Sequence, residues 1–257
     1  MTYRKYSKYS IENPEVYAMT QLKYVKQETG FLVRIFKKYG KVKKILDVGC
    51  GIGAHAKELA DKGYECVGVD ANPAMIRYAK GRYRGIEFHV QRMQNLRVWG
   101  KFDALICIGN IIAFNRSNKE VMQTFGNFNR HLRKGGLLIL STLNPISYIK
   151  NKNFRPAFVD KSEDRKRFGI KAVYNETINE RKQTMTSTRT FYTLKGNRKV
   201  GSYTKESRLY FPQEMKFFLE QAGFKVIEFY SADSCEFTLR KTKLDKSELI
   251  VVAGKNA

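Results

Sequence analysis

Cysteine and histidine are scarce in this chain, and their spacing excludes two kinds of site. The four cysteines and three histidines are scattered over 257 residues, and no Cys-x-x-Cys pair occurs. This spacing argues against a disulfide framework and a zinc site, and no metal is expected. We interpret the cysteines as buried free thiols in a reducing cytoplasm. The residues are Cys50, Cys66, Cys107, Cys235, His55, His89 and His131.

Long apolar runs are also missing. No stretch of about 18 consecutive apolar residues occurs, so we expect no transmembrane helix and no membrane partner. The first residues, Met1–Tyr6, contain no apolar signal region. A cytoplasmic location is therefore expected.

Acidic residues are outnumbered two to one by basic ones. The chain has 24 Asp+Glu and 48 Lys+Arg, which gives a formal net charge of +24. Such an excess suits an anionic partner such as nucleic acid. It also fits a merely basic composition, because the lysines are spread along the whole chain without a long block of like charge. We prefer the second interpretation.

The most informative pattern begins at residue 45. The segment 45–48 is a short apolar strand, as expected for a parallel strand buried on both faces. The glycine-rich segment 49–53 permits a sharp turn and a close approach by a ligand, and a helix begins near residue 54. A second apolar strand, 66–69, ends in Asp70, whose carboxylate can accept hydrogen bonds from a ribose. The arrangement predicts a nucleotide-type ligand loop.

Apolar strands alternate with helices through most of the chain, which predicts an α/β fold. The pattern indicates a doubly wound, mostly parallel seven-stranded sheet, with a small antiparallel β lid inserted before the last helix. In the lid, polar and apolar residues alternate, and Lys195–Arg198 has the composition of a hairpin turn. We divide the chain into an N-terminal arm and helix covering the site (1–40), a core (41–145 and 209–257) and the lid (146–208).

Four segments of the core resemble motifs of the class I S-adenosylmethionine-dependent methyltransferases. They are Leu46–Gly53, Gly68–Ile76, Phe102–Cys107 and Leu132–Ile139. The ending, Tyr-Phe-Pro-x-Glu followed by Ala-Gly-Phe over residues 210–224, is also similar to that family. The resemblance is nearest to small-molecule N-methyltransferases of the glycine and amino-sugar type. It implies a Rossmann-like methyltransferase fold, transferase activity and S-adenosyl-L-methionine (SAM) as the cofactor.

The resemblance also implies which residues would bind SAM. They are Asp47, Gly49, Cys50, Gly51, Asp70, Ala71, Met75, Arg92, Met93 and Ile108. The family commonly has an acid before the methionine, and that acid accepts the adenine amino group. Here Arg92 stands in its place, and a guanidinium cannot accept a hydrogen bond. Met93 can still offer its backbone N–H, Gln91 or Gln94 an acceptor, and Arg92 a plane for stacking.

For the methyl acceptor the sequence offers candidate residues. Tyr17 and Tyr24 lie seven residues apart on a helix expected over residues 15–38, and they share one face. In the family this segment covers the cofactor. Asn110 follows the fourth strand at the ligand end of the sheet, and Tyr210 ends the aromatic-rich lid segment. No general base is assigned.

The preferred interpretation is methyl transfer to a small molecule, with nitrogen as the favoured acceptor atom. A methyltransferase that acts on RNA or another macromolecule through the basic surface is the first alternative. A non-catalytic protein that binds the cofactor or RNA is the second. Nucleic acid is thus a less favoured partner than a small molecule, and no oligomeric state is assigned.

Overall fold

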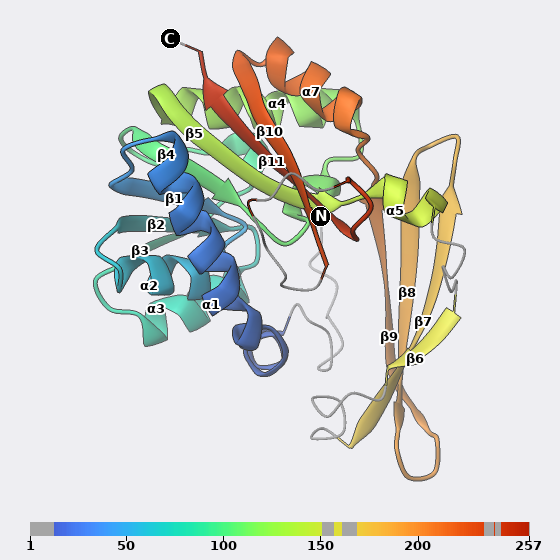
Figure 1. Ribbon diagram of the computed structural model, residues 1–257. Helices are drawn as coiled ribbons and strands as arrows, with labels where there is room; N and C mark the ends of the chain where they lie inside the picture. The colour runs from blue at the N-terminus through green and yellow to red at the C-terminus, as the bar shows by residue number, and fades with distance from the viewer. Residues whose placement is uncertain (1–12, 151–156, 161–168, 234–238, 240–242, 257) are drawn as a thin grey trace.

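A seven-stranded sheet forms the centre of the protein, and a second sheet of four strands stands beside it (Figure 1). The structure, a computed structural model, describes residues 13–150, 157–160, 169–233, 239 and 243–256. The predicted arm before residue 13, parts of the predicted lid and Cys235 therefore lie outside the described residues.

The strand order of the central sheet is β10-β11-β5-β4-β1-β2-β3. Strand β11 pairs antiparallel with both of its neighbours, and the other pairs are parallel. The predicted α/β fold with a mostly parallel seven-stranded sheet is therefore confirmed. The bounds are β1 Lys44–Val48, β2 Glu65–Asp70, β3 Glu87–Val90, β4 Phe102–Cys107, β5 Leu132–Leu143, β10 Phe224–Ala232 and β11 Glu248–Lys255.

Helices cover both faces of this sheet (Figure 1). Side chains alternate along each buried strand, so neighbouring residues face opposite layers. On β4, Leu105 packs in the layer that contains α4 and α7, whereas Ala104 and Ile106 pack in the layer that contains α1. The bounds are α1 Pro14–Tyr39, α2 Ala54–Ala60, α3 Pro73–Arg82, α4 Asn118–His131, α5 Pro145–Lys150 and α7 Pro212–Gln221, with 3-10 turns η1 Met93–Asn95 and η2 Ile111–Phe114.

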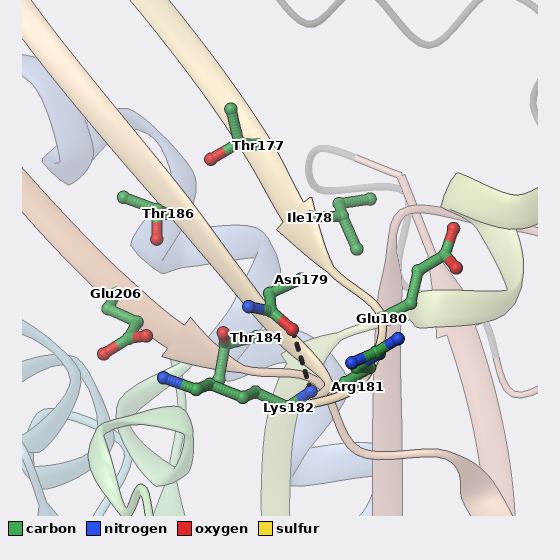
Figure 2. Close-up of a pocket in the computed structure, with 9 residues that line it drawn as sticks. All are labelled: Thr177, Ile178, Asn179, Glu180, Arg181, Lys182, Thr184, Thr186 and Glu206. Carbon is green, nitrogen blue, oxygen red and sulfur yellow. Dashed lines mark hydrogen bonds between the residues drawn. The ribbon is translucent and has the colours of Figure 1, made fainter.

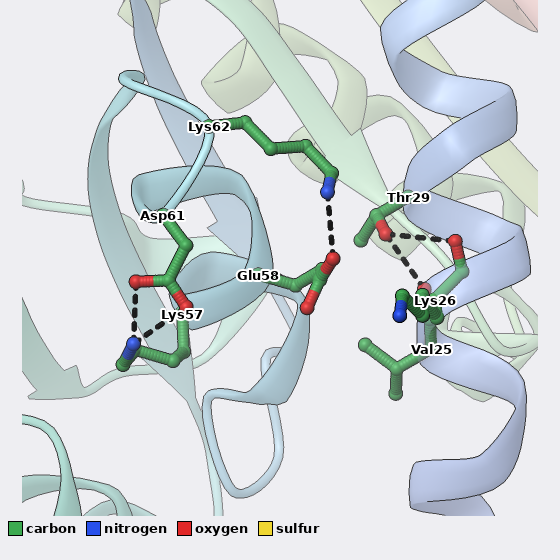
Figure 3. A network of polar contacts seen from close by, with 7 residues as sticks. All are labelled: Val25, Lys26, Thr29, Lys57, Glu58, Asp61 and Lys62. Atoms are coloured by element: carbon green, nitrogen blue, oxygen red, sulfur yellow. Dashed lines mark hydrogen bonds and ion pairs between the residues drawn. The ribbon is translucent and has the colours of Figure 1, made fainter.

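Helix α1 spans residues 14–39, close to the expected 15–38, and is continuous across the central sheet. The Asn13 side chain accepts a hydrogen bond from the backbone N–H of Glu15, and Pro14 occupies the first turn, so the helix begins where the sequence predicts. Thr29 is fully buried, and its hydroxyl donates to the carbonyl of Val25 (Figure 3). The second half of α1, with Phe31, Leu32 and Ile35, packs in the core and anchors the helix, whereas its first turns reach the ligand end of the sheet.

The second sheet has the order β6-β7-β8-β9 with antiparallel pairs. Its bounds are β6 Ala157–Asp160, β7 Ile170–Asn179, β8 Thr184–Thr193 and β9 Lys199–Arg208. The predicted hairpin turn between β8 and β9 is confirmed, because Gly196 and Asn197 adopt left-handed φ values of 74° and 49°. We keep the name lid for this sheet.

The Lys134-Gly135-Gly136 segment does not cap a helix, because α4 ends at His131. Strand β5 begins at Leu132 instead, and the pairing of β4 with β5 shifts register across the glycines. Gly135, with φ of 68°, allows this irregular start of the strand.

The three cysteines in the described part of the chain are free thiols, as predicted. Within the same residues, no helix has both the length and the hydropathy needed to cross a membrane.

Candidate active site

The glycine-rich loop between β1 and α2 has a conformation that requires its glycines. Gly49, Gly51 and Gly53 have φ values of 77°, 54° and 76°, in the left-handed region. A Cβ on Gly49 would lie 2.6 Å from the Ile111 side chain, and one on Gly51 would lie 3.7 Å from the Tyr17 ring. Because Gly51 has no side chain on the side that faces Tyr17, a ligand can approach the backbone of the loop closely there.

Asp70, at the end of β2, fixes this loop. Its Oδ2 accepts a hydrogen bond of 2.9 Å from the backbone N–H of Gly51, and its Oδ1 accepts one of 2.7 Å from Asn72. Burial raises the pKa of the carboxyl, and the two backbone hydrogen bonds oppose that shift. Each carboxylate oxygen can accept a second hydrogen bond. Asp70 can therefore position the loop and still bind a ribose.

Asp47 is the least satisfied polar group of the site. It is 3% exposed, and its Oδ2 has no hydrogen-bond partner among the described residues. Burial raises its pKa to about 6, and the nearby His55 acts in the opposite direction. A buried carboxylate oxygen without a partner is costly. A cationic ligand group beside the loop would supply the missing partner.

A cavity of about 300 Å³ opens beside the loop, at the carboxyl ends of β1, β4 and β5. This is the point where the strand order of the sheet reverses, which is the usual ligand position in doubly wound folds. Helix α1 forms its cover. The lining residues are Tyr17, Gln21, Tyr24, Glu28, Asp47, Gly49, His55, Ile108, Gly109, Asn110, Thr142, Leu143 and Glu248.

The cavity is acidic although the chain is strongly basic. Among the lining residues that the structure describes, Glu28, Asp47 and Glu248 are acids, and none is Lys or Arg. His55 Nε2 lies 2.7 Å from Glu28 Oε2. Burial lowers the pKa of His55, but the hydrogen bond and the charge of Glu28, with that of Asp47, outweigh it and place the pKa above the ordinary 6.5. The pair links α1 directly to the first turn of α2.

Asn110 has a fixed orientation at the cavity. It adopts a left-handed φ of 64°, and its Oδ1 accepts hydrogen bonds from Thr142 Oγ1 at 2.9 Å and from the backbone N–H of Leu143 at 3.1 Å. With the oxygen engaged, the Nδ2 group is the one that can donate to a ligand. Asn110 and both predicted tyrosines of α1 thus line one cavity.

The residues proposed for the adenosine half lie at neighbouring strand ends. Cys50 is buried within the loop, Met75 is buried on α3, Met93 is buried in η1, and Ala71 is exposed after Asp70. Of the two glutamines considered as acceptors, Gln91 Oε1 accepts from the Arg97 N–H, and Gln94 Nε2 donates to Asn115 Oδ1.

Arg92 is exposed at the end of β3. The pKa of the neighbouring Glu120 is lowered, first by hydrogen bonds from the backbone of Ser117 and Arg116, and also by the charge of Arg92. The guanidinium is therefore close enough to Glu120, in the first turn of α4, to act on its titration.

Tyr210 does not belong with the other acceptor-side candidates. It is fully buried, and its hydroxyl donates to the carbonyl of Asn115 at 2.9 Å. Its ring packs in the layer of α4 and α7, and it is not among the lining residues of the cavity. The interpretation of Tyr210 as an acceptor-side residue is corrected for this reason.

The sequence analysis missed several cavity residues, and for two of them a signal was present. Tyr17, Gln21, Tyr24 and Glu28 recur at spacings of four, three and four, which places all four on one helix face. Extending the tyrosine pair along this stripe would have found Gln21 and Glu28. Glu248 has no such signal, because only the pairing of β11 with β5 brings it to the cavity.

The Glu28→Gln substitution is expected to destabilise the protein by roughly 1.5–3 kcal/mol at pH 6, the range for a hydrogen bond to a charged group. The pKa of His55 is raised in the folded protein. The stabilisation from its ion pair with Glu28 is therefore fully present below about pH 6.5 and is lost as the pH rises through the folded pKa. The loss of Tm on substitution should therefore be larger at pH 6 than at pH 9. Glu58→Gln, which removes an exposed pair with Lys62 (Figure 3), is the control. Equal losses at both pH values would contradict the ion pair.

A second hollow, of about 490 Å³, lies on the lid at the turn between β7 and β8 (Figure 2). It contains none of the predicted site residues. Its one bond drawn in Figure 2 runs from the backbone N–H of Lys182 to Asn179 Oδ1 and closes the turn. We assign no ligand to it.

The strand order, the glycine loop and the acid that ends β2 form a doubly wound fold with a ligand loop at its switch point. Residues 45–136 of the chain match the family model described as "Methyltransferase domain". The resemblance inferred from the motifs is thereby confirmed.

Among its relatives, a glycine/sarcosine N-methyltransferase of Halorhodospira halochloris is 34% identical over 125 residues, which is 46% of this chain and 46% of the relative. The chain thus matches less than half of that relative's length. A SAM-dependent methyltransferase structure from Clostridium acetobutylicum has a TM-score of 0.76 at 15% identity, covering 95% of this chain and 97% of that one. A SAM-bound amino pentose methyltransferase from Micromonospora echinaspora has a TM-score of 0.71 at 20% identity and full coverage of both chains. At these identities the two structures show the fold alone.

Proposed function

We propose that this protein is a SAM-dependent methyltransferase that methylates a nitrogen atom of a small molecule. The observation that carries the proposal is the cavity itself. It joins the glycine loop to Asn110 and to the tyrosines of α1 in a space of about 300 Å³, which lies within the size range of small-molecule pockets.

The residues of the loop fit SAM. The buried, unpartnered Asp47 Oδ2 suits an ammonium group, Asp70 suits a ribose, and the bare backbone at Gly49 and Gly51 admits close approach. We assign Met93 and Ile108 to the cofactor as well. When bound, SAM supplies a methyl group already activated on a sulfonium, so the chain mainly has to bind and orient the two reactants.

Two observations favour nitrogen as the acceptor atom. The charged lining residues that the structure describes are acids and one histidine, a set that attracts amines. Several relatives are also named for amine substrates, including the glycine/sarcosine enzyme above and an amino-sugar N,N-dimethyltransferase of Streptomyces venezuelae. We extend only the acceptor type, an amine, to this chain.

The lid is proposed to cover the acceptor. Lys205 of β9 lies over the Phe114 ring, with Nζ 4.6 Å from the ring centroid, and Phe114 belongs to the turn that follows Asn110. The inner face of the lid is therefore next to the acceptor side of the cavity.

Calorimetry with SAM tests the cofactor assignment. We expect saturable binding with one SAM per chain, and absence of binding would contradict the proposal. A parallel titration with single-stranded RNA tests the alternative. RNA binding that depends on SAM and falls steeply with salt would favour a macromolecular substrate instead.

A further inference from the structure

Glu248 stands out among the cavity residues because no part of the proposed cofactor site uses it. It begins β11, opposite Leu143 of β5, and lines the cavity together with Asn110 and Thr142. This position is on the acceptor side, beyond the loop that would hold the methionine end of SAM.

The two charges that act on the titration of Glu248 are both negative. Glu28 on α1 and Asp233 after β10 act on it, and burial together with these two charges raises its pKa to about 7. Tyr148 of α5 lies on the lid side, and its pKa is raised to about 12, first by burial and then by Glu176 of β7 and Glu248 itself. Asp233 is compensated by Lys246 at 3.0 Å, whereas none of the described residues that line the cavity is a Lys or Arg that could compensate Glu248.

Glu28 and Glu248, which come from different elements, thus both face the cavity. His55 lies 2.7 Å from Glu28 and balances it, whereas the described lining offers Glu248 no Lys or Arg, so a ligand would supply its positive charge. A carboxylate or phosphate next to the acceptor nitrogen would be repelled there. We propose, given the proposed function, that the acceptor is a cationic amine without an acidic group beside the nitrogen, and that Glu248 accepts its proton.

In the proposed reaction, proton transfer to Glu248 precedes methyl transfer to the nitrogen. The ammonium gives one proton to a carboxylate oxygen of Glu248, which frees the nitrogen lone pair. The nitrogen then bonds to the methyl carbon as the carbon–sulfur bond breaks, and the bonding electrons go to sulfur, so the sulfonium becomes a neutral thioether. A general base of this kind is most effective when its pKa lies near the working pH.

The test uses matched acceptors and the full chain. Binding of ethanolamine and glycine, and of alaninol and alanine, is measured on protein loaded with S-adenosylhomocysteine, and methyl transfer is measured with SAM. We expect each amine to be preferred over the amino acid of its pair. A preference for the amino acids, or no binding of either amine, would overturn the inference.

Glu248→Gln is expected to lower kcat/KM for the preferred amine by about 100-fold at pH 7. In the wild type, kcat/KM should rise with pH through about 7 as Glu248 loses its proton. The variant should lack this rise, and Glu248→Asp should restore part of it. Glu65→Gln, an exposed residue paired with Lys43, is the control and should change neither value. An unchanged pH profile in Glu248→Gln would overturn the role of the carboxylate.

SAM affinity distinguishes failure of the role of Glu248 from failure of the proposed function. If Glu248→Gln binds SAM as the wild type does but keeps the wild-type rate and pH profile, only the role of Glu248 fails. If the wild type does not bind SAM, the proposed function fails.

Discussion

The Asp70→Ala variant is expected to bind SAM at least about 100-fold more weakly than the wild type. Two hydrogen bonds from ribose hydroxyls to a charged carboxylate contribute about 1.5–3 kcal/mol each, and their loss multiplies Kd by about 100 or more. The substitution also removes the acceptor for the Gly51 N–H, which fixes the loop. Calorimetry with SAM measures the loss directly.

The control for this experiment is Asp61→Ala, which removes an exposed carboxylate paired with Lys57 at the end of α2. It should leave the Kd for SAM unchanged. Because Asp70 also anchors the loop, a urea titration of both variants reports whether the fold is retained. A folded Asp70→Ala protein with wild-type affinity for SAM would contradict the assignment of Asp70 to the cofactor.

The Gly53→Ala variant is expected to lose about 2–5 kcal/mol of unfolding free energy. A left-handed φ costs a residue with a Cβ about 1–2 kcal/mol, and overpacking a core costs about 1–3 kcal/mol. At Gly53 both terms apply, because φ is 76° and the new Cβ would lie 2.6 Å from the Phe88 ring. Urea denaturation measures the loss.

Gly63→Ala is the matched control. Its φ is 90°, close to that of Gly53, but a Cβ there would meet nothing within 4 Å. Only the backbone term of about 1–2 kcal/mol is expected. Similar losses in the two variants would show that the contact with Phe88 does not limit the substitution.

The central fold was predictable because its signals are local. The apolar strand 45–48, the glycines after it and Asp70 at the end of the next strand lie within about 25 residues, and each element restricts the next. The candidate residues at the strand ends were then predicted from the rule that parallel strands bring their carboxyl ends to one edge of the sheet. Asn110 was found in this way, and the structure places it in the cavity.

The remainder of the site depends on contacts between distant segments. Glu28 reaches His55 across 27 positions of sequence, and Glu248 reaches the cavity through pairing with a strand about 100 residues earlier. Tyr210 shows the reverse case. Because Tyr210 lies next to the lid in the sequence, it was expected on the acceptor side of the site. Its hydroxyl instead donates to the carbonyl of buried Asn115, and its ring packs in the layer of α4 and α7.

The contrast between a basic chain and an acidic cavity has a consequence for how an acceptor would arrive. A net charge of +24 repels a cationic amine at long range, while the carboxylates attract it only at short range. Dissolved salt screens the long-range repulsion more than the interaction inside the cavity. For such an acceptor the exterior acts as a kinetic barrier, and moderate ionic strength accelerates entry instead of slowing it, the opposite of electrostatic steering.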